Sequence, residues 1–150
     1  MKRLYIDKVH PKVFRALSAA SQEASDAATA AGLGLDLIEI CKVRASQING
    51  CLICMSIHTD VAREAGVTQR QLDLITGWRE EKSPFTQEQR AALALTEEIT
   101  RVDDDLAMDR ALELAGGLFT PEQVSAISWN VIMIGALNRL SIVSGHPPRR

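Results

Sequence analysis

Hydrophobic positions recur at helical spacing along most of the chain. Val13, Leu17 and Ala20 fall on one face of a segment that opens at Pro11, a residue favoured in the first turn of helices. Gly32 and the residues after it interrupt the pattern. No stretch alternates apolar and polar residues over the length of a strand. The pattern therefore predicts an all-α protein.

The second predicted helix is apolar on more than one side, which indicates burial on several faces. Asn49-Gly50 ends it, because both residues tolerate the left-handed backbone found at helix ends. A third helix is predicted from near Cys51 to Gly66. The apolar positions of the second helix are Leu35, Leu37, Ile38, Ile40, Cys41, Val43 and Ala45.

Short polar segments mark the remaining helices. One of these segments, Thr86-Gln-Glu-Gln89, has the form of a capping box, in which the Thr and Gln side chains bond reciprocally to the backbone of the first turn. The residues Lys82 to Pro84 are predicted to form a loop. The predicted helices run from Thr68 through Ile75, from Thr86-Gln-Glu-Gln89 onward, from Asp103–Asp105 to Gly116-Gly117, and from Thr120-Pro-Glu-Gln123 to Val143.

The last predicted helix is too apolar to face water on any broad side. Two interpretations follow: it lies at the centre of the bundle, or it buries a surface between subunits, because large apolar patches usually mark interfaces. Its apolar residues are Val124, Ile127, Trp129, Val131, Ile132, Met133, Ile134, Leu137, Leu140 and Ile142.

Composition narrows the class of protein. With 150 residues, 46% of them hydrophobic and 24% charged, the chain has the size and balance of a single globular domain, which we assign to residues 1–150. A net charge of −2 without a basic cluster argues against nucleic acid as a partner. No export signal and no uninterrupted membrane-spanning run is visible, so a cytoplasmic protein without membrane contact is predicted.

The chemistry of the sequence is concentrated at Cys51, Cys54 and His58. On a helix that begins near Cys51, these residues fall at positions i, i+3 and i+7 and share a face. A thiol near a helix N-terminus is stabilised as the nucleophilic thiolate by the helix dipole. The second sulfur can then convert a sulfenic acid or a mixed disulfide into an internal disulfide. The spacing predicts a redox-active dithiol.

Glu39 is the fourth candidate site residue. It lies between Ile38 and Ile40 in the apolar second helix, where a carboxylate either reaches solvent or is buried for a purpose. Placed against His58, it would fix the imidazole tautomer and complete a proton relay. The alternative is a solvated surface pair with Lys42, one turn further along.

Other interpretations of the cysteines stay open. A Cys-x-x-Cys can occur by chance, and Cys-x2-Cys-x3-His, with Glu39 as a fourth ligand, has donors suited to zinc. Helical ligands without a second cysteine pair are atypical of zinc sites. Cys41 has no cysteine or histidine at helical spacing and is predicted to be a small buried hydrophobe.

As a set, these motifs resemble the carboxymuconolactone decarboxylase superfamily, in particular its alkyl hydroperoxidase D (AhpD-like) branch. The central pattern is Glu39, eleven residues, Cys51, two residues, Cys54, three residues and His58. The resemblance extends from about Pro11 to Ile142. Further matching segments are residues 46–50, 63–66, 78–80, 85–86, 90–97, 129–130 and 138–140.

The resemblance implies an AhpD-like helical bundle that assembles into a trimer or hexamer. It also implies a thiol-dependent peroxidase or disulfide oxidoreductase, with Cys51 and Cys54 as the redox pair and Glu39 and His58 as the proton relay. The substrate would be a hydroperoxide or a partner disulfide, the electron donor a dithiol or redox protein, and no metal, haem or flavin would be needed.

One position departs from the larger members of this branch, which carry a histidine between the cysteines where this chain has Ile53. Lactone decarboxylation is disfavoured, because the decarboxylase branch lacks the cysteine pair, although the fold alone would permit it. A decarboxylase-like lyase and a non-enzymatic oligomeric scaffold are the alternatives.

Overall fold

The computed structural model describes residues 3–80 and 83–148, and within those ranges every regular element is a helix. The prediction of an all-α fold is thereby confirmed, while the short first helix was not expected. The helices are α1 (Ile6–Val9), α2 (Pro11–Ala30), α3 (Leu35–Asn49), α4 (Leu52–Glu64), α5 (Gln69–Leu74) with a 3₁₀ turn at Ile75–Gly77, α6 (Gln87–Arg101), α7 (Asp105–Gly116) and α8 (Pro121–Ser144).

The helix starts follow from local side-chain bonds. Thr68, Thr86 and Thr120 each form a complete capping box with the glutamine three residues later, and Asp104 caps α7. The capping box predicted at Thr86 is confirmed, and those at Thr68 and Thr120 were not predicted. Of the predicted loop at Lys82–Pro84, Ser83 and Pro84 lie in a turn, and Lys82 falls outside the described residues.

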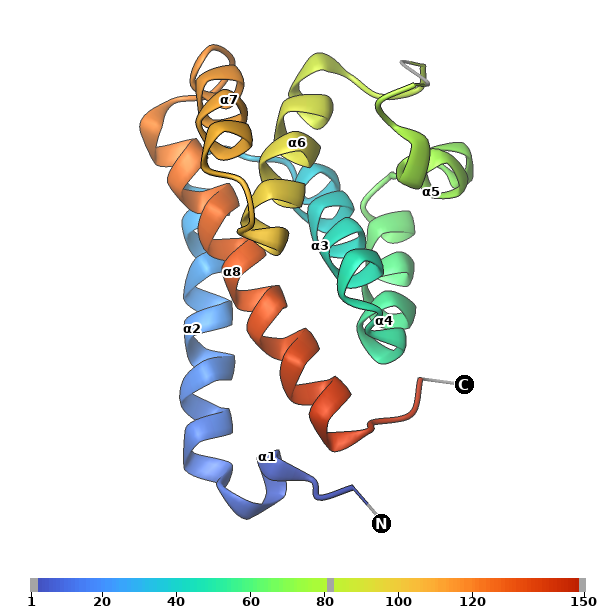
Figure 1. Cartoon of the computed structure of the whole chain (residues 1–150), viewed down its shortest axis with the longest axis vertical. Helices are drawn as coiled ribbons and strands as arrows, with labels where there is room; N and C mark the ends of the chain where they lie inside the picture. Colours follow the sequence, from blue (N-terminus) through green and yellow to red (C-terminus); the bar gives the residue numbers. More distant parts are fainter. Residues whose placement is uncertain (1–2, 81–82, 149–150) are drawn as a thin grey trace.

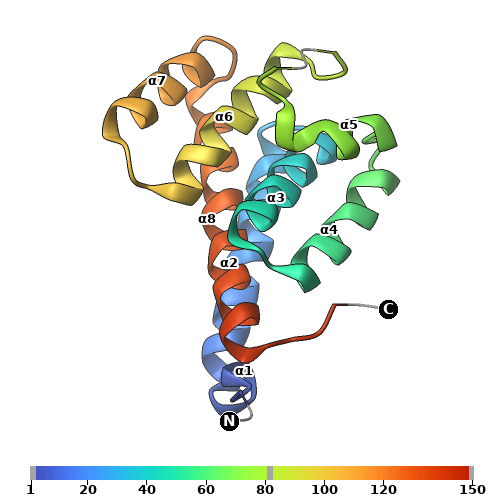
Figure 2. The same cartoon turned by 45° about the vertical axis from the view of Figure 1, so that its right-hand side comes forward.

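The long helices α2 and α8 run side by side in opposite directions and form one edge of the bundle (Figure 1). Helix α3 is the centre of the molecule, because it packs against α4, α6 and α8. Helix α7 lies against α6 at the far end from the start of α4, as the turned view in Figure 2 shows. The turn that connects α3 to α4 therefore lies toward one end of the bundle, away from α7.

Helix α8 has both a core face and an exposed apolar face. Ile127, Val131 and Ile134 are buried, whereas Trp129 is 53% exposed and Ile132 is also exposed. The sequence left a central helix and an interface helix as alternatives. The buried face shows that α8 contributes to the core, although it lies at the edge of the bundle and α3 at its centre. The exposed apolar face leaves the interface as a prediction.

Two buried asparagines fix the position of α8 in the bundle. The Asn130 amide donates 2.7 Å to the Ala24 carbonyl of α2, and Asn138 bonds to the end of α3. By length and composition alone, α8 could cross a membrane, with a mean hydropathy of 1.4 over its most apolar window. Its bonds to α2 and α3 are those of a core helix in a bundle, in which buried polar groups find partners.

A buried carboxylate joins α3 to α6. Glu97 accepts a 3.0 Å hydrogen bond from the indole N–H of Trp78 and forms ion pairs with Arg44 of α3 at 2.6 Å and with Arg79 at 2.9 Å. Burial would raise the pKa of Glu97, but the bonds from Trp78 and Arg44 outweigh it and hold the pKa below its ordinary value. This cluster fixes the segment after α5 against the core.

Candidate active site

A left-handed turn places the cysteine pair at the start of α4. Gly50 ends α3 with φ of 70°, a conformation that L side chains rarely adopt. Cys51 follows as the N-cap residue of α4, and its carbonyl accepts a 2.9 Å bond from the Met55 N–H. The sulfur of Cys51 therefore lies at the positive end of the helix, as the sequence predicted.

Cys51 and Cys54 are joined as a disulfide, with their Cα atoms 5.3 Å apart. Both residues belong to the core, with 1% of Cys51 and 5% of Cys54 exposed. From its position at the start of the helix alone, Cys51 would be expected to be the more accessible of the two, and that expectation is wrong. Packing of the turn against α3 and α8 covers Cys51 more completely than the helix spacing indicates.

Glu39 and His58 are in direct contact. The Oε2 atom of Glu39 lies 2.7 Å from Nδ1 of His58, joining α3 to α4. His58 lies one turn beyond Cys54 along α4. The structure thus brings all four predicted site residues to the α3–α4 hairpin.

Lys42 is part of the same cluster, which the sequence did not predict. Its Nζ lies 2.9 Å from Oε1 of Glu39, and the two side chains are only 11% and 3% exposed. The solvated Glu39–Lys42 surface pair considered from the sequence is therefore wrong. The two residues are paired but buried, so one carboxylate bridges a lysine and a histidine.

The charge on Glu39 is set by competing effects. Burial would raise the pKa of its carboxyl, but the hydrogen bond from His58 and the positive charge of Lys42 hold that pKa below its ordinary value. Glu39 is consequently ionised at neutral pH and can only accept hydrogen bonds. The His58 proton is then on Nδ1, and Nε2 keeps the lone pair that can take a proton.

Cys41 lies apart from this chemistry. It is free and fully buried, and burial raises the pKa of its thiol to about 12. A thiol of that pKa is not a nucleophile near neutral pH. The prediction that Cys41 is a small buried hydrophobe is confirmed.

Asn138 of α8 anchors the turn that leads into Cys51. Its amide nitrogen donates 3.1 Å to the Ser46 hydroxyl, and its Oδ1 accepts a 3.0 Å bond from the Asn49 amide. The Cys51 N–H in turn donates 3.0 Å to the Ser46 carbonyl. Sequence reasoning missed this role, although a polar residue in so apolar a helix was a usable signal.

A small cavity of about 150 Å³ opens beside Cys51. It lies between the start of α4 and the C-terminal end of α8, where Arg3 donates a 2.7 Å bond to the Ile142 carbonyl. Gly145 and His146 also line it. The cavity gives a small molecule a place next to the dithiol.

The described residues, 3–80 and 83–148, contain no group of three or more His, Cys, Asp or Glu side chains arranged to hold a metal ion. The constellation that the structure does contain is a cysteine pair and a carboxylate–histidine pair. Fold and site together define the class as an all-helical dithiol protein.

Comparison with known proteins identifies the family. Residues 11–98 match the carboxymuconolactone decarboxylase family, so the chain belongs to that family, and its AhpD-like branch is the one that the structural comparison supports. The uncharacterized protein YdfG of Bacillus subtilis (strain 168) is 32% identical over 108 residues, covering 72% of this chain and 73% of that protein.

A solved structure from Agrobacterium tumefaciens has the same fold. It matches with a TM-score of 0.86 and 27% identity, over 100% of this chain and 99% of that one. That protein is of unknown function, and a role in antioxidant defence as AhpD has been suggested for it. The comparisons thus point to an antioxidant or related function and leave the reaction open.

Proposed function

We propose that this protein is a thiol-dependent peroxidase in which Cys51 and Cys54 cycle between dithiol and disulfide. The observation that carries the proposal is the 2.7 Å contact between the ionised Glu39 and Nδ1 of His58, one helical turn from Cys54. A carboxylate in that place orients the imidazole and fixes its tautomer, which suits proton transfer at a thiol.

The chemistry runs from a reduced pair. His58 takes the proton of the attacking thiol, which we assign to Cys54, through Nε2. The thiolate attacks one oxygen of the hydroperoxide, the O–O bond breaks, and the leaving alkoxide takes the proton from His58 to give an alcohol. Cys54 is now a sulfenic acid. The Cys51 sulfur displaces its oxygen as water and closes the disulfide, which an external dithiol or redox protein reduces again.

Burial of the cysteines favours a small oxidant over a protein disulfide. With 1% and 5% of the two residues exposed, a macromolecular partner cannot bring its own sulfur to them without movement of the hairpin. The cavity of about 150 Å³ that Cys51 lines would admit a small molecule to the Cys51 side of the pair, whereas Cys54, the assigned attacking thiol, does not line it. Reduction of a partner disulfide at the same four residues is the other outcome of the test below.

The test follows the thiols of the reduced protein during stopped-flow mixing with tert-butyl hydroperoxide. Two thiols per chain should be lost together with one equivalent of alcohol formed, and peptide mapping should show a single Cys51–Cys54 bridge. The Cys51→Ser variant should accumulate a sulfenic acid that dimedone traps, and Cys54→Ser should be inert. Cys41→Ser is the matched control and should behave as wild type.

Slow oxidation in which the thiols lost do not match the alcohol formed would count against the peroxidase. A disulfide that includes Cys41 would also count against it. Turnover of a protein disulfide without turnover of hydroperoxide would assign the same dithiol to disulfide reduction instead. The cytoplasmic location and the identity of the electron donor stay predictions.

A further inference from the structure

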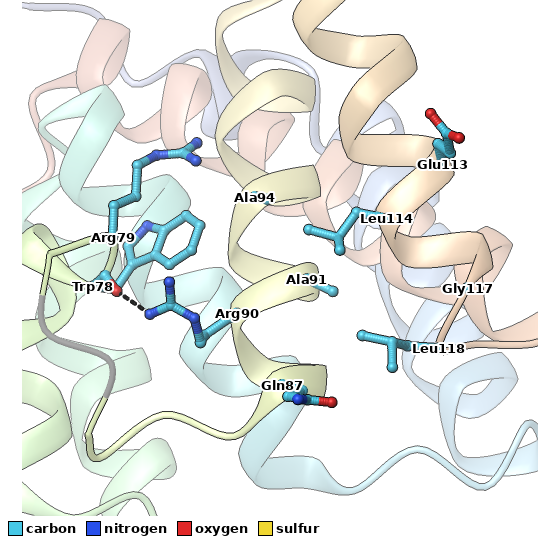
Figure 3. A pocket seen from close by; sticks show the side chains of 10 residues that line it. All are labelled: Trp78, Arg79, Gln87, Arg90, Ala91, Ala94, Glu113, Leu114, Gly117 and Leu118. Carbon is cyan, nitrogen blue, oxygen red and sulfur yellow. Dashed lines mark hydrogen bonds between the residues drawn. The ribbon is translucent and has the colours of Figure 1, made fainter.

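A second cavity, of about 750 Å³, lies between α6, α7 and the segment after α5. None of the four proposed site residues lines it. Figure 3 shows Ala91 and Ala94 of α6 on its floor and Trp78 and Arg90 on one wall. The other wall carries Leu114 of α7 and Leu118, which follows the end of that helix. A volume of this size is within the range of small-molecule sites, about 300–1,000 Å³.

The floor and one wall of this groove are apolar. Ala91 and Ala94 present only methyl groups, so the space between the two walls is not filled by the chain itself. Leu114 and Leu118 are exposed, although they face this hollow. Apolar side chains that line a concave, solvent-open surface indicate an apolar ligand group.

The opposite wall carries the positive charge of Arg90. Arg90 is half-buried, its guanidinium carbon lies 5.3 Å from the centre of the Trp78 ring, and one of its N–H groups donates to the Trp78 carbonyl. Across residues 3–80 and 83–148 no carboxylate is within ion-pair distance of Arg90. Arg79, by contrast, is neutralised by Glu97 at 2.9 Å.

We propose that this groove binds a small amphipathic carboxylate, such as a medium-chain or aryl-alkyl acid. The carboxylate pairs with the free N–H groups of Arg90, which match its two oxygens, and the chain lies over Ala91 and Ala94 against Leu114. Glu113 on the α7 rim sets the orientation, because it repels an anionic group placed at that end.

The unpaired guanidinium distinguishes this occupant from a helix of a second copy. An apolar helix face laid into the groove would take Arg90 further from water without supplying a counterion, which is unfavourable. A ligand with one anionic head and an apolar tail satisfies both walls at once. The proposal is independent of the peroxidase activity, since the two sites share no residue.

Decanoate is the probe, and fluorescence of Trp78 is the readout. The chain has two tryptophans, so the experiment uses a Trp129→Phe background, in which Trp78 alone reports. Titration below the micellar concentration should give a saturable change in emission. Decanol, with the same tail and no charge, should bind at least about tenfold more weakly, as expected for loss of a charge-assisted pair.

Two variants and one control test the assignment. Arg90→Gln should weaken decanoate binding about tenfold or more, and Leu114→Glu, at an exposed position of the apolar wall, should abolish it by placing a charge against the apolar tail while circular dichroism stays unchanged. Arg70→Gln, on the exposed side of α5, makes the same change in net charge as Arg90→Gln and should bind as the background does. Leu114→Glu keeps the test decisive if Arg90→Gln is unstable.

Equal affinity of Arg90→Gln and the background for decanoate would overturn the proposal, because binding would then not depend on the guanidinium. Absence of saturable decanoate binding would also overturn it. If Leu114→Glu in addition changed the mass of the protein in light scattering, the groove would be assigned to contact between copies of the chain.

Discussion

The imidazole of His58 has two nitrogens, and Glu39 determines which of them is available. The carboxylate accepts from Nδ1–H at 2.7 Å, and Lys42 at 2.9 Å keeps that carboxylate ionised in a buried place. A buried charge with two partners is stable, whereas the same charge alone would be costly. Lys42 would therefore support the proposed proton relay, although in the sequence it lies outside the segment from Cys51 to His58.

Glu39→Gln and His58→Ala should each slow alkylation of the reduced dithiol by iodoacetamide at pH 7. In the proposed mechanism both residues help to deprotonate the attacking thiol, so each change should leave less of it as thiolate, and the alkylation rate should fall in proportion to the thiolate fraction. Raising the pH should recover most of the loss. The two losses should not add in the double variant, because residues that act in one chain fail together.

Glu64→Gln is the control for this experiment, since it makes the same charge change at an exposed position on α4. Rate-against-pH profiles of the four proteins are the measurement. A profile for Glu39→Gln that matches wild type would remove Glu39 from the relay and leave a dithiol assisted by histidine alone.

Sequence spacing located Cys51, Cys54 and His58, because residues three and four apart on a helix share a face whatever surrounds them. Glu39 was found because a carboxylate between two isoleucines needs an explanation. The burial of Lys42 was missed, since its spacing from Glu39 is the same in a surface pair and in a buried one. Only the packing of α4 over α3 distinguishes the two cases.

Among the elements, the α3–α4 hairpin depends on α8 for its shape. The turn at Gly50 lies between two helices and belongs to neither. The hydrogen bonds that join Asn138 to Ser46 and to Asn49 fix it against the bundle. The pair of cysteines follows directly after this turn. Asn138, which lies 89 residues from Asn49 in the sequence, thus holds the turn from which α4 begins.

Asn138→Ala should lower the free energy of unfolding by about 1–3 kcal/mol, because it leaves buried partners on α3 without their bonds. Chemical denaturation of the reduced protein is the measurement, with disulfide closure after mild oxidation recorded in parallel. Gln22→Ala, exposed on α2, serves as control and should change stability by no more than about 0.5 kcal/mol. An Asn138→Ala protein as stable as this control would show that the turn does not need α8.

Helix boundaries were predictable where the cause is local. The threonine caps of α6 and α8 form with residues three positions along, so their motifs are complete in the sequence. The short α1 was missed because it has no side-chain cap, and its first N–H lies 3.3 Å from the Ser144 hydroxyl at the other end of the chain. Hydrogen bonds between residues so far apart in the sequence leave no local sequence pattern that predicts the helix.

At the scale of the whole molecule, the α2–α8 edge combines an exposed indole with hollows of the surface. Trp129 lines two of them, one of about 390 Å³ with Ala20, Ala24 and Met133, and one of about 400 Å³ with Ala30. Exposed apolar residues also occur elsewhere, as at Leu106 and Leu114 of α7, but at this edge an exposed indole lies beside two hollows. It is the place where an assembly would bury apolar area.

We therefore expect a trimer or hexamer whose interface includes the α2–α8 edge. In light scattering at micromolar concentration, wild type should have the mass of such an oligomer, and Trp129→Glu should shift it to the monomer, because burial of a charge at an interface core is unfavourable. Leu106→Glu is the control, since Leu106 is equally apolar and exposed but lies on α7. A monomeric wild type would show that the exposed indole serves no assembly, and an oligomer that Trp129→Glu leaves intact would place the interface on another face.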